Sequence, residues 1–106
     1  MTEAKAIRLS QFQQFDSTRV VSKLIHDSER CRVVLFCLEA GQEVTPHTSR
    51  SEVLFYGVEG QGTISIGADE VIIEEGTLVA CPQMVPHGIK AEERTVVLAI
   101  ITPRPE

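Results

Sequence analysis

Residues 41–62 read GQEVTPHTSRSEVLFYGVEGQG, and residues 76–87 read GTLVACPQMVPH. Each stretch combines glycines, a short run of Val, Leu or aromatic residues, and a single histidine, His47 in the first and His87 in the second. Short β-branched and aromatic runs bounded by glycine and acidic residues are typical of strands joined by tight turns. The two stretches therefore predict β-structure, and they raise the question of whether the two histidines share one site.

The same pattern extends from residue 20 to the end of the chain. The segment ISIGADEVIIEE (64–75) predicts a hairpin with a turn at 67–69, because its apolar residues alternate with polar ones on either side of the turn. No segment after residue 20 shows a sustained helical period, so we expect an all-β sandwich or barrel. The predicted strands are 20–26, 32–40, 52–60, 62–68, 70–75, 77–82, 87–93 and 95–103.

Length and composition limit the organisation of the chain. A chain of 106 residues predicts one domain, which we divide into an N-terminal strand or arm (1–19) and a barrel (20–106). The net charge of −5, with mixed charge clusters, argues against nucleic acid or an anionic membrane as a partner. No segment has the apolar length of a membrane span, and residues 1–12 do not read as a signal peptide, so we expect a cytoplasmic protein.

The three cysteines are odd in number and lack CxxC spacing, so neither a disulfide framework nor a zinc knuckle is predicted. Cys37 and Cys81 lie within apolar runs and are expected to be buried small hydrophobic residues. The chain also lacks the phosphate-binding and dinucleotide-binding fingerprints and the Gly-x-Ser-x-Gly elbow, and we assign no catalytic residue.

The two opening stretches resemble the two motif regions of the cupins. The first cupin motif runs glycine, five residues, His-x-His, three or four residues, glutamate, six residues and glycine. The second runs glycine, five residues, proline, any residue, glycine, two residues and histidine. The spacings from Gly41 through His47 to Gly60, and from Gly76 through Pro82 to His87, fit these motifs. The resemblance covers about residues 20–102 and implies a double-stranded β-helix, or jelly-roll, barrel.

The resemblance also implies a metal site, but the ligand positions are incomplete. In metal-binding cupins the two histidines and the glutamate of the first motif and the histidine of the second hold one transition-metal ion. His47 and His87 take two of these positions, whereas Ser49 and Val53 stand where the second histidine and the glutamate belong. Glu52 is one residue early. On one regular strand through residues 47–53, His47, Ser49 and Val53 would share the inner face and Glu52 would point outward, unless a bulge between Ser49 and Glu52 turned it inward. We therefore name His47, His87 and a re-registered Glu52 as the metal ligands, for one divalent ion (Zn, Fe, Ni or Mn), weakly held or absent.

We predict that the barrel binds a small organic molecule. The predicted ligand-binding residues are His47, Ser49, His87, Tyr56 and Met84. Further candidates to line the cavity are Phe36, Phe55 and Ile100. One alternative is a metal-dependent enzyme, a dioxygenase, isomerase or decarboxylase acting on a small acid or sugar derivative. Another is a non-catalytic sensor or partner-binding module. The resemblance also implies a homodimer, in which residues 1–19 would cover an exposed sheet edge.

Overall fold

The structure, a computed structural model, describes residues 4–105. Each of the eight predicted runs forms a strand, with ends shifted by one or two residues. One strand, Glu43–His47, was not predicted, because its sequence is short, polar and contains Pro46. The elements are a 3-10 helix η1 (Leu9–Phe12) and strands β1 (Val21–Asp27), β2 (Arg32–Leu38), β3 (Glu43–His47), β4 (Glu52–Glu59), β5 (Gln61–Ile66), β6 (Asp69–Glu74), β7 (Leu78–Cys81), β8 (His87–Ala91) and β9 (Thr95–Thr102).

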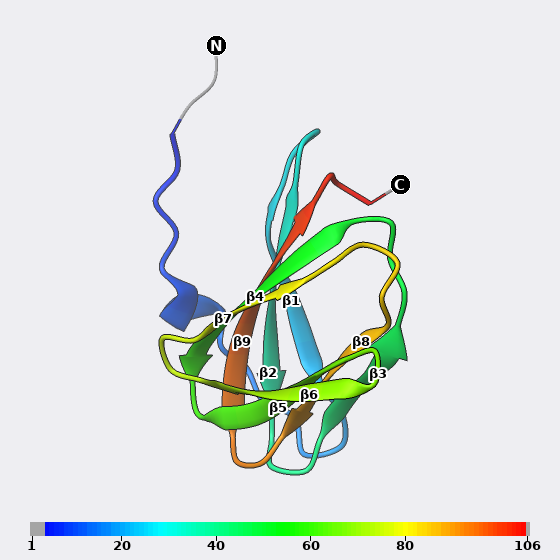
Figure 1. Ribbon diagram of the computed structural model, residues 1–106. Helices are drawn as coiled ribbons and strands as arrows, with labels where there is room; N and C mark the ends of the chain where they lie inside the picture. Colours follow the sequence, from blue (N-terminus) through cyan, green and yellow to red (C-terminus); the bar gives the residue numbers. More distant parts are fainter. Residues whose placement is uncertain (1–3, 106) are drawn as a thin grey trace.

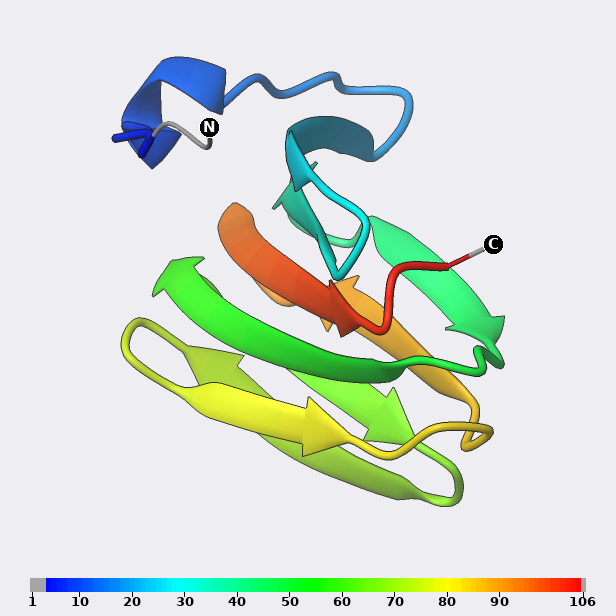
Figure 2. The same cartoon turned by 90° about the horizontal axis from the view of Figure 1, so that it is seen from above.

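The strands form two antiparallel sheets, as Figures 1 and 2 show. The first has the order β1-β2-β9-β4-β7 and the second the order β3-β8-β5-β6. The prediction of an all-β double-stranded β-helix is therefore confirmed. The prediction of a closed barrel is wrong in one respect. The chain passes repeatedly from one sheet to the other, but no strand of one sheet pairs with a strand of the other, so within residues 4–105 each sheet keeps two free edges.

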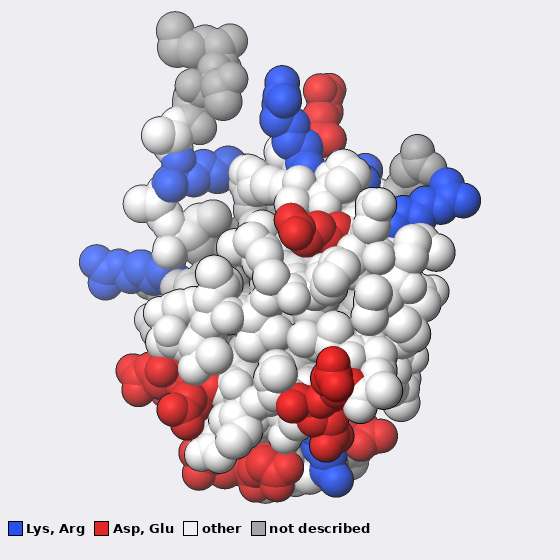
Figure 3. Space-filling model, viewed as in Figure 1, with Lys and Arg blue, Asp and Glu red and all other residues white. Residues whose placement is uncertain are grey.

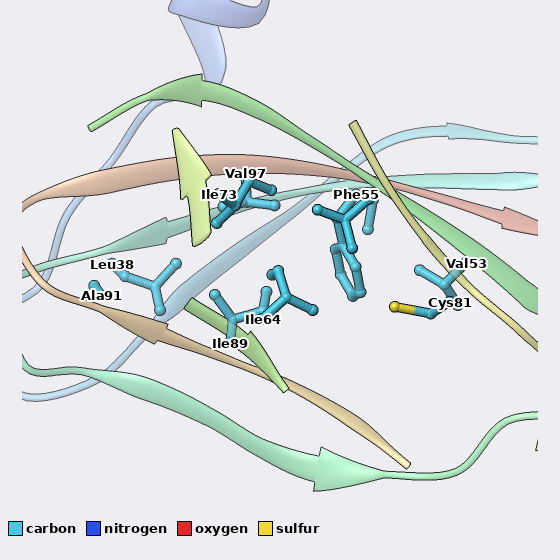
Figure 4. Packing of buried hydrophobic residues seen from close by; sticks show 11 residues of the cluster. Leu38, Val53, Phe55, Ile64, Ile73, Cys81, Ile89, Ala91 and Val97 are labelled. Carbon is cyan, nitrogen blue, oxygen red and sulfur yellow. The ribbon is translucent and has the colours of Figure 1, made fainter. Parts of the chain in front are cut away.

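The main hydrophobic core fills the space between the two sheets (Figure 4). Alternate residues of β4 point into it, because Val53 and Phe55 are buried whereas Glu52 and Tyr56 are exposed. Cys81 is also buried in this core, as predicted. Its buried members are Leu38, Val53, Phe55, Ile64, Ile73, Val79, Cys81, Ile89, Ala91, Val97 and Ala99.

The N-terminal segment forms an arm on the outside of the five-stranded sheet. Residues 4–20 contain η1 and no strand, and Phe12 and Phe15 pack against a second buried cluster that includes Cys37. Arg94 holds the arm in place, since its guanidinium lies 4.1 Å from the centre of the Phe15 ring. Residues 1–3 of the predicted arm lie outside the described residues. No helix in the described segment is long and apolar enough to cross a membrane.

Three glycines of the motif spacing occupy the turns at one end of the sandwich. Gly41, Gly60 and Gly76 have φ values of 85°, 80° and 84°, in the region that strongly favours glycine. They follow β2, β4 and β6, so the spacing of the motif reflects the lengths of the strands between left-handed turns. The predicted hairpin is also present, but its turn is the pair Gly67 and Ala68, because Asp69 already pairs with Ile66.

Candidate functional site

A cavity of about 250 Å³ opens between the sheets at the end opposite these glycine turns. Its walls are mainly apolar, and its polar side chains lie together on β3, the loop after β3, and the first residue of β8. Phe36 and Phe55 line it as predicted. The lining residues are Phe36, Val44, His47, Thr48, Ser49, Val53, Phe55, His87, Gly88, Ile89, Ala99, Ile101 and Pro105.

His47 and His87 are direct partners across the β3–β8 ladder. Their ring centroids are 4.7 Å apart, and the Phe55 ring meets the His87 ring edge to face, with 5.8 Å between the centroids. The pairing depends on a register shift in β3 between Val44 and His47. Without this extra residue, two positions three apart would point to opposite faces. The structure thus has a bulge near the site, but it lies before His47 and not between Ser49 and Glu52.

Gly88 makes room for this bulge. A Cβ atom at residue 88 would lie 2.7 Å from the Val44 carbonyl oxygen and 3.0 Å from the Pro46 nitrogen. Pro46 is tolerated here because β3 is an edge strand and the residue sits at the bulge, where a ladder donor is not required. The residue after His87 must therefore be small, because the strand that carries His47 packs closely against its backbone.

His87 is held as a neutral imidazole with one nitrogen available to a ligand. The residue is only 2% exposed, and its Nδ1 lies 3.1 Å from the Val85 carbonyl oxygen. A carbonyl can only accept, so Nδ1 carries the proton and Nε2 is an acceptor. No buried side-chain nitrogen or oxygen among the described residues lacks a partner, so Nε2, which has no protein partner, must be reached through the cavity. Burial lowers the pKa of His87 below 6.5, with a further contribution from nearby His47.

We expect the free energy of unfolding to fall as the pH is lowered from 6.5 toward the depressed pKa of His87. In this window the unfolded chain binds a proton at His87 and the folded chain does not, so acid favours unfolding by up to about 1.4 kcal/mol per pH unit. Arg104 lowers the pKa of Asp27 to about 2, which places its titration below this window. Urea denaturation of wild type and His87→Gln between pH 7 and 5 would test this. If the free energy of unfolding of the variant depended on pH as strongly as that of wild type, this expectation would be contradicted.

Ser49 lies in the loop that carries the chain from β3 to β4. Its carbonyl accepts a hydrogen bond from the Met84 amide at 2.7 Å, and its Oγ accepts one from the Ser51 amide at 3.0 Å. The hydroxyl hydrogen of Ser49 remains free to donate into the cavity that Ser49 lines. Ser51 is buried, but its hydroxyl donates to the Pro103 carbonyl at 2.6 Å. Of the predicted ligand-binding residues, the structure brings together His47, Ser49 and His87.

The metal set that the resemblance implied does not fit these residues. Glu52 is exposed on the outer face of β4, so its assignment as an inward-turned ligand is wrong. The residue that faces the cavity at this point is Val53, which offers no donor atom. A catalytic zinc site takes three protein ligands, and a non-haem iron site usually takes two histidines and a carboxylate. Residues 4–105 contain no group of three or more His, Cys, Asp or Glu side chains placed to hold a metal ion.

Tyr56 and Met84 do not line this cavity, so the structure does not bring them together with the other predicted ligand-binding residues. Tyr56 alternates with inward-facing Phe55 and lies on the outer face of the sheet, 39% exposed. Ile100 faces outward for the same reason, since it pairs with Leu54 on that face. Met84 is 59% exposed in the loop between β7 and β8. The period of two would have separated Tyr56 from Phe55, but sequence could not show which of the two pointed inward.

Met84 has a different role, which the motif could have revealed. It stands where the second cupin motif has glycine, two residues after Pro82, and it is the only non-glycine residue with positive φ (67°) among residues 4–105. This backbone conformation accompanies the hydrogen bond from the Met84 amide to Ser49. Met84 therefore supports the cavity loop through its backbone, at the cost of local strain.

We expect Met84→Gly to raise the free energy of unfolding by up to about 1 kcal/mol. The substitution removes the left-handed strain of a side-chain-bearing residue, which exceeds the entropic cost of glycine in the unfolded chain. Because the Met84 side chain is exposed, little packing is lost. Urea denaturation of the variant would measure the change, and Gln83→Gly, at an exposed neighbour without positive φ, provides the control. If Met84→Gly lost as much stability as the control, the conclusion that the Met84 backbone is strained would be contradicted.

Comparison with known proteins completes the description of the site. Residues 34–101 match the family model described as Cupin_2, cupin domain. An RmlC-like cupin from Desulfovibrio desulfuricans is 30% identical over 96% of this chain and 99% of that one, with a TM-score of 0.89. The Thermus thermophilus protein TT1209 is 24% identical over 96% of this chain and 100% of that one, with a TM-score of 0.91. An uncharacterized double-stranded β-helix protein from Klebsiella pneumoniae is 13% identical over 95% and 91% of the two chains, with a TM-score of 0.87. No curated protein matches the chain.

Proposed function

The chain belongs to the cupin domain family, and from this premise we propose that it binds a small, largely apolar organic molecule between its sheets without a metal ion held by the protein. One observation carries the proposal. The cavity has apolar walls, and its few polar side chains, those of His47, Thr48, Ser49 and His87, lie together at one end. Small-molecule sites have this composition, in which apolar walls supply affinity and a few polar groups fix orientation.

The size of the cavity and the protonation of His87 restrict the ligand. An engineered cavity of about 150 Å³ binds benzene, so a cavity of about 250 Å³ has room for a ring or a branched aliphatic group with a substituent. Because Nε2 of His87 is an acceptor, the ligand should place a hydrogen-bond donor against it. The alternative of a metal-dependent enzyme required Glu52 to face the cavity as a ligand. It loses this support, because Glu52 lies on the outer face of β4. A pocket that contains both histidines also counts against a sensor that works only through its outer surface.

The test uses benzyl alcohol, which combines a ring with a hydroxyl donor. We expect millimolar binding, detected by NMR shifts of the Ala99 methyl and the His87 ring. Ala99→Leu fills the cavity from β9 and should abolish these shifts, whereas Ala40→Leu, at an exposed position in the turn between β2 and β3, should leave the affinity unchanged. Circular dichroism checks that both variants fold. Equal binding by the two variants, or no binding to wild type, would contradict the proposal.

We also propose that two copies pair through the outer face of the five-stranded sheet. Neighbouring strands place Leu54 beside Ile100 and Tyr56 beside Leu98 and Leu78, so this face is apolar where a water-facing sheet is usually polar. The position of the N-terminal arm favours a second copy of this chain as the partner on this face. Residues 4–8 are exposed and extend away from the body (Figure 1), where they could lie over an identical sheet and be buried with it.

We expect light scattering to give twice the mass of one chain for wild type and the mass of one chain for Leu78→Glu. Leu78 is 60% exposed on the proposed interface, and a buried unpaired carboxylate there would oppose association. Ile72→Glu is a matched control, because Ile72 is also 60% exposed but lies on β6 of the other sheet. A monomeric wild type, or dissociation by the control alone, would overturn this interface.

A further inference from the structure

Charge is distributed unequally between the two ends of the sandwich. The connections at the cavity end carry Arg30, Arg50 and Arg104 against Glu29, and the strand ends beside them carry Arg32 against Asp27, Glu52 and Asp69. Figure 3 shows acidic side chains gathered over the opposite, lower end of the molecule. The connections and strand ends there contain Glu39, Glu59, Glu74, Glu75, Glu92 and Glu93, opposed by Arg94. In a protein of net charge −5, the cavity end is thus close to neutral, whereas the opposite end is acidic.

A second depression adjoins the cavity at this end. Ser49 and Pro105 line both, and the second is otherwise lined by Arg50, Ser51, Pro103 and Arg104. A molecule seated against His87 could therefore extend past Ser49 toward the guanidinium of Arg50 without crossing the body of the protein. The apolar cavity and the cationic depression form one continuous surface with two chemical characters.

The loop that carries Arg50 is held by hydrogen bonds on both sides of the residue. Ser49 accepts from the Met84 amide, and the Ser51 hydroxyl donates to the Pro103 carbonyl. The backbone at Arg50 is thus tied to the β7–β8 loop and to the C-terminal segment. A cation on a backbone held in this way loses less entropy on binding than one on a free loop.

Arg50 is the arginine in this depression that is free to bind an anion. Arg104 also lines it, but donates two hydrogen bonds to Asp27, at 2.7 and 3.0 Å, so its charge is already compensated. No carboxylate of residues 4–105 lies within salt-bridge distance of Arg50. The neighbouring Ser49 hydroxyl has a free hydrogen, since its oxygen accepts from Ser51. One guanidinium and one hydroxyl donor match the two oxygens of a carboxylate.

We infer that the ligand of this cavity is a small monocarboxylate, with its apolar part between the sheets and its carboxylate bound by Arg50 and the Ser49 hydroxyl. The inference rests on the proposed function and names the class of ligand. A single uncompensated guanidinium favours a monoanion, whereas a phosphate dianion would require a second free cation. The acidic opposite end adds a field that favours entry of an anion at this end.

The experiment compares matched acids and amides whose hydroxyl supplies the donor for Nε2 of His87: 3-hydroxyisovalerate and 3-hydroxyisovaleramide, 3-hydroxybenzoate and 3-hydroxybenzamide, and 3-hydroxyphenylacetate and 3-hydroxyphenylacetamide. Each pair shares its shape and differs in charge. NMR titrations of wild type should show at least one pair in which the acid binds about tenfold more tightly than its amide, the effect of a partly exposed charged hydrogen bond. Sodium chloride at about 200 mM should weaken binding of the acid and leave binding of the amide unchanged. Inorganic phosphate should not compete.

Arg50→Gln should abolish the preference for the acid and leave binding of the amide intact. Arg30→Gln is the matched control, because Arg30 is exposed at the same end of the molecule but lines neither depression, and it should keep the preference. Equal binding of acids and amides to wild type, or an unchanged preference in Arg50→Gln, would overturn the inference and leave the proposed function standing. Failure of all six compounds and of benzyl alcohol would contradict the proposed function itself.

Discussion

Replacement of Gly60 by alanine is expected to lower the free energy of unfolding by about 3–4 kcal/mol, the largest loss we predict for a change of one methyl group. Two effects add. Gly60 has a φ of 80°, which disfavours any residue with a Cβ atom. A Cβ atom here would also collide with the Arg94 carbonyl oxygen in the turn before β9. Because the atoms that this Cβ would meet belong to the backbone, no side chain can rotate to relieve the contact, and one of the two strand connections must move.

Gly41→Ala separates the two effects. Gly41 has a φ of 85°, but a Cβ atom added to it would meet no heavy atom within 4 Å. It should therefore show only the conformational cost, about 1–2 kcal/mol. Urea denaturation of both variants, with the same dependence on denaturant as wild type, would measure the difference. Equal losses would mean that the β8–β9 turn yields easily, which would contradict the close packing of the turns at this end.

The double substitution Ser49→His with Val53→Glu is expected to create a tight site for a divalent transition metal. Both residues line the cavity that already contains His47 and His87, so the variant would offer three imidazoles and a carboxylate to one ion. Loss of one outer partner of a metal ligand already costs about 10- to 100-fold in affinity. Two added direct ligands should therefore raise the affinity for Ni²⁺ or Zn²⁺ by at least about 100-fold.

Calorimetric titration of the double variant with Ni²⁺ would measure this gain, and the melting temperature should rise with metal because the ion binds only the folded state. The variant without metal should be less stable than wild type, since Val53 is buried and a lone carboxylate there is costly. Ser49→His with Leu54→Glu is the matched control, because Leu54 faces the other side of β4. If the control gains the same affinity, our assignment of the inner face is wrong.

Most of the fold could be predicted from local patterns. Tight turns need residues that tolerate positive φ, so Gly41, Gly60 and Gly76 marked strand ends, and apolar runs of strand length filled the intervals between them. β3 was not predicted, because it contains Pro46 and a bulge, which are not typical of a strand and are tolerated mainly at the edge of a sheet. Edge position is a property of the sheet order, and no short stretch of sequence contains it.

The candidate site was predicted in part, and partly through an incorrect premise. We treated His47 and Val53 as members of one strand whose alternation would place both inside. They lie on β3 and β4, in different sheets, with a loop between them. The conclusion held because the inner faces of two facing sheets look into the same cavity. Tyr56 lies outside this cavity, and its position could not be predicted because a side chain's chemistry does not show which face of its strand is covered.

The sequence by itself determined the all-β class, the family and the two histidines, since these depend on residue types at fixed spacings along the chain. Only the tertiary structure decided that His47 and His87 are cross-strand partners and that Val53, not Glu52, faces them. It also decided that Arg50 lies beside their cavity without an ion pair to any carboxylate of residues 4–105. The physical reason is that these are relations between segments far apart in the chain. They are set by sheet register, by a single extra residue in β3 and by which carboxylates come within reach of which arginines.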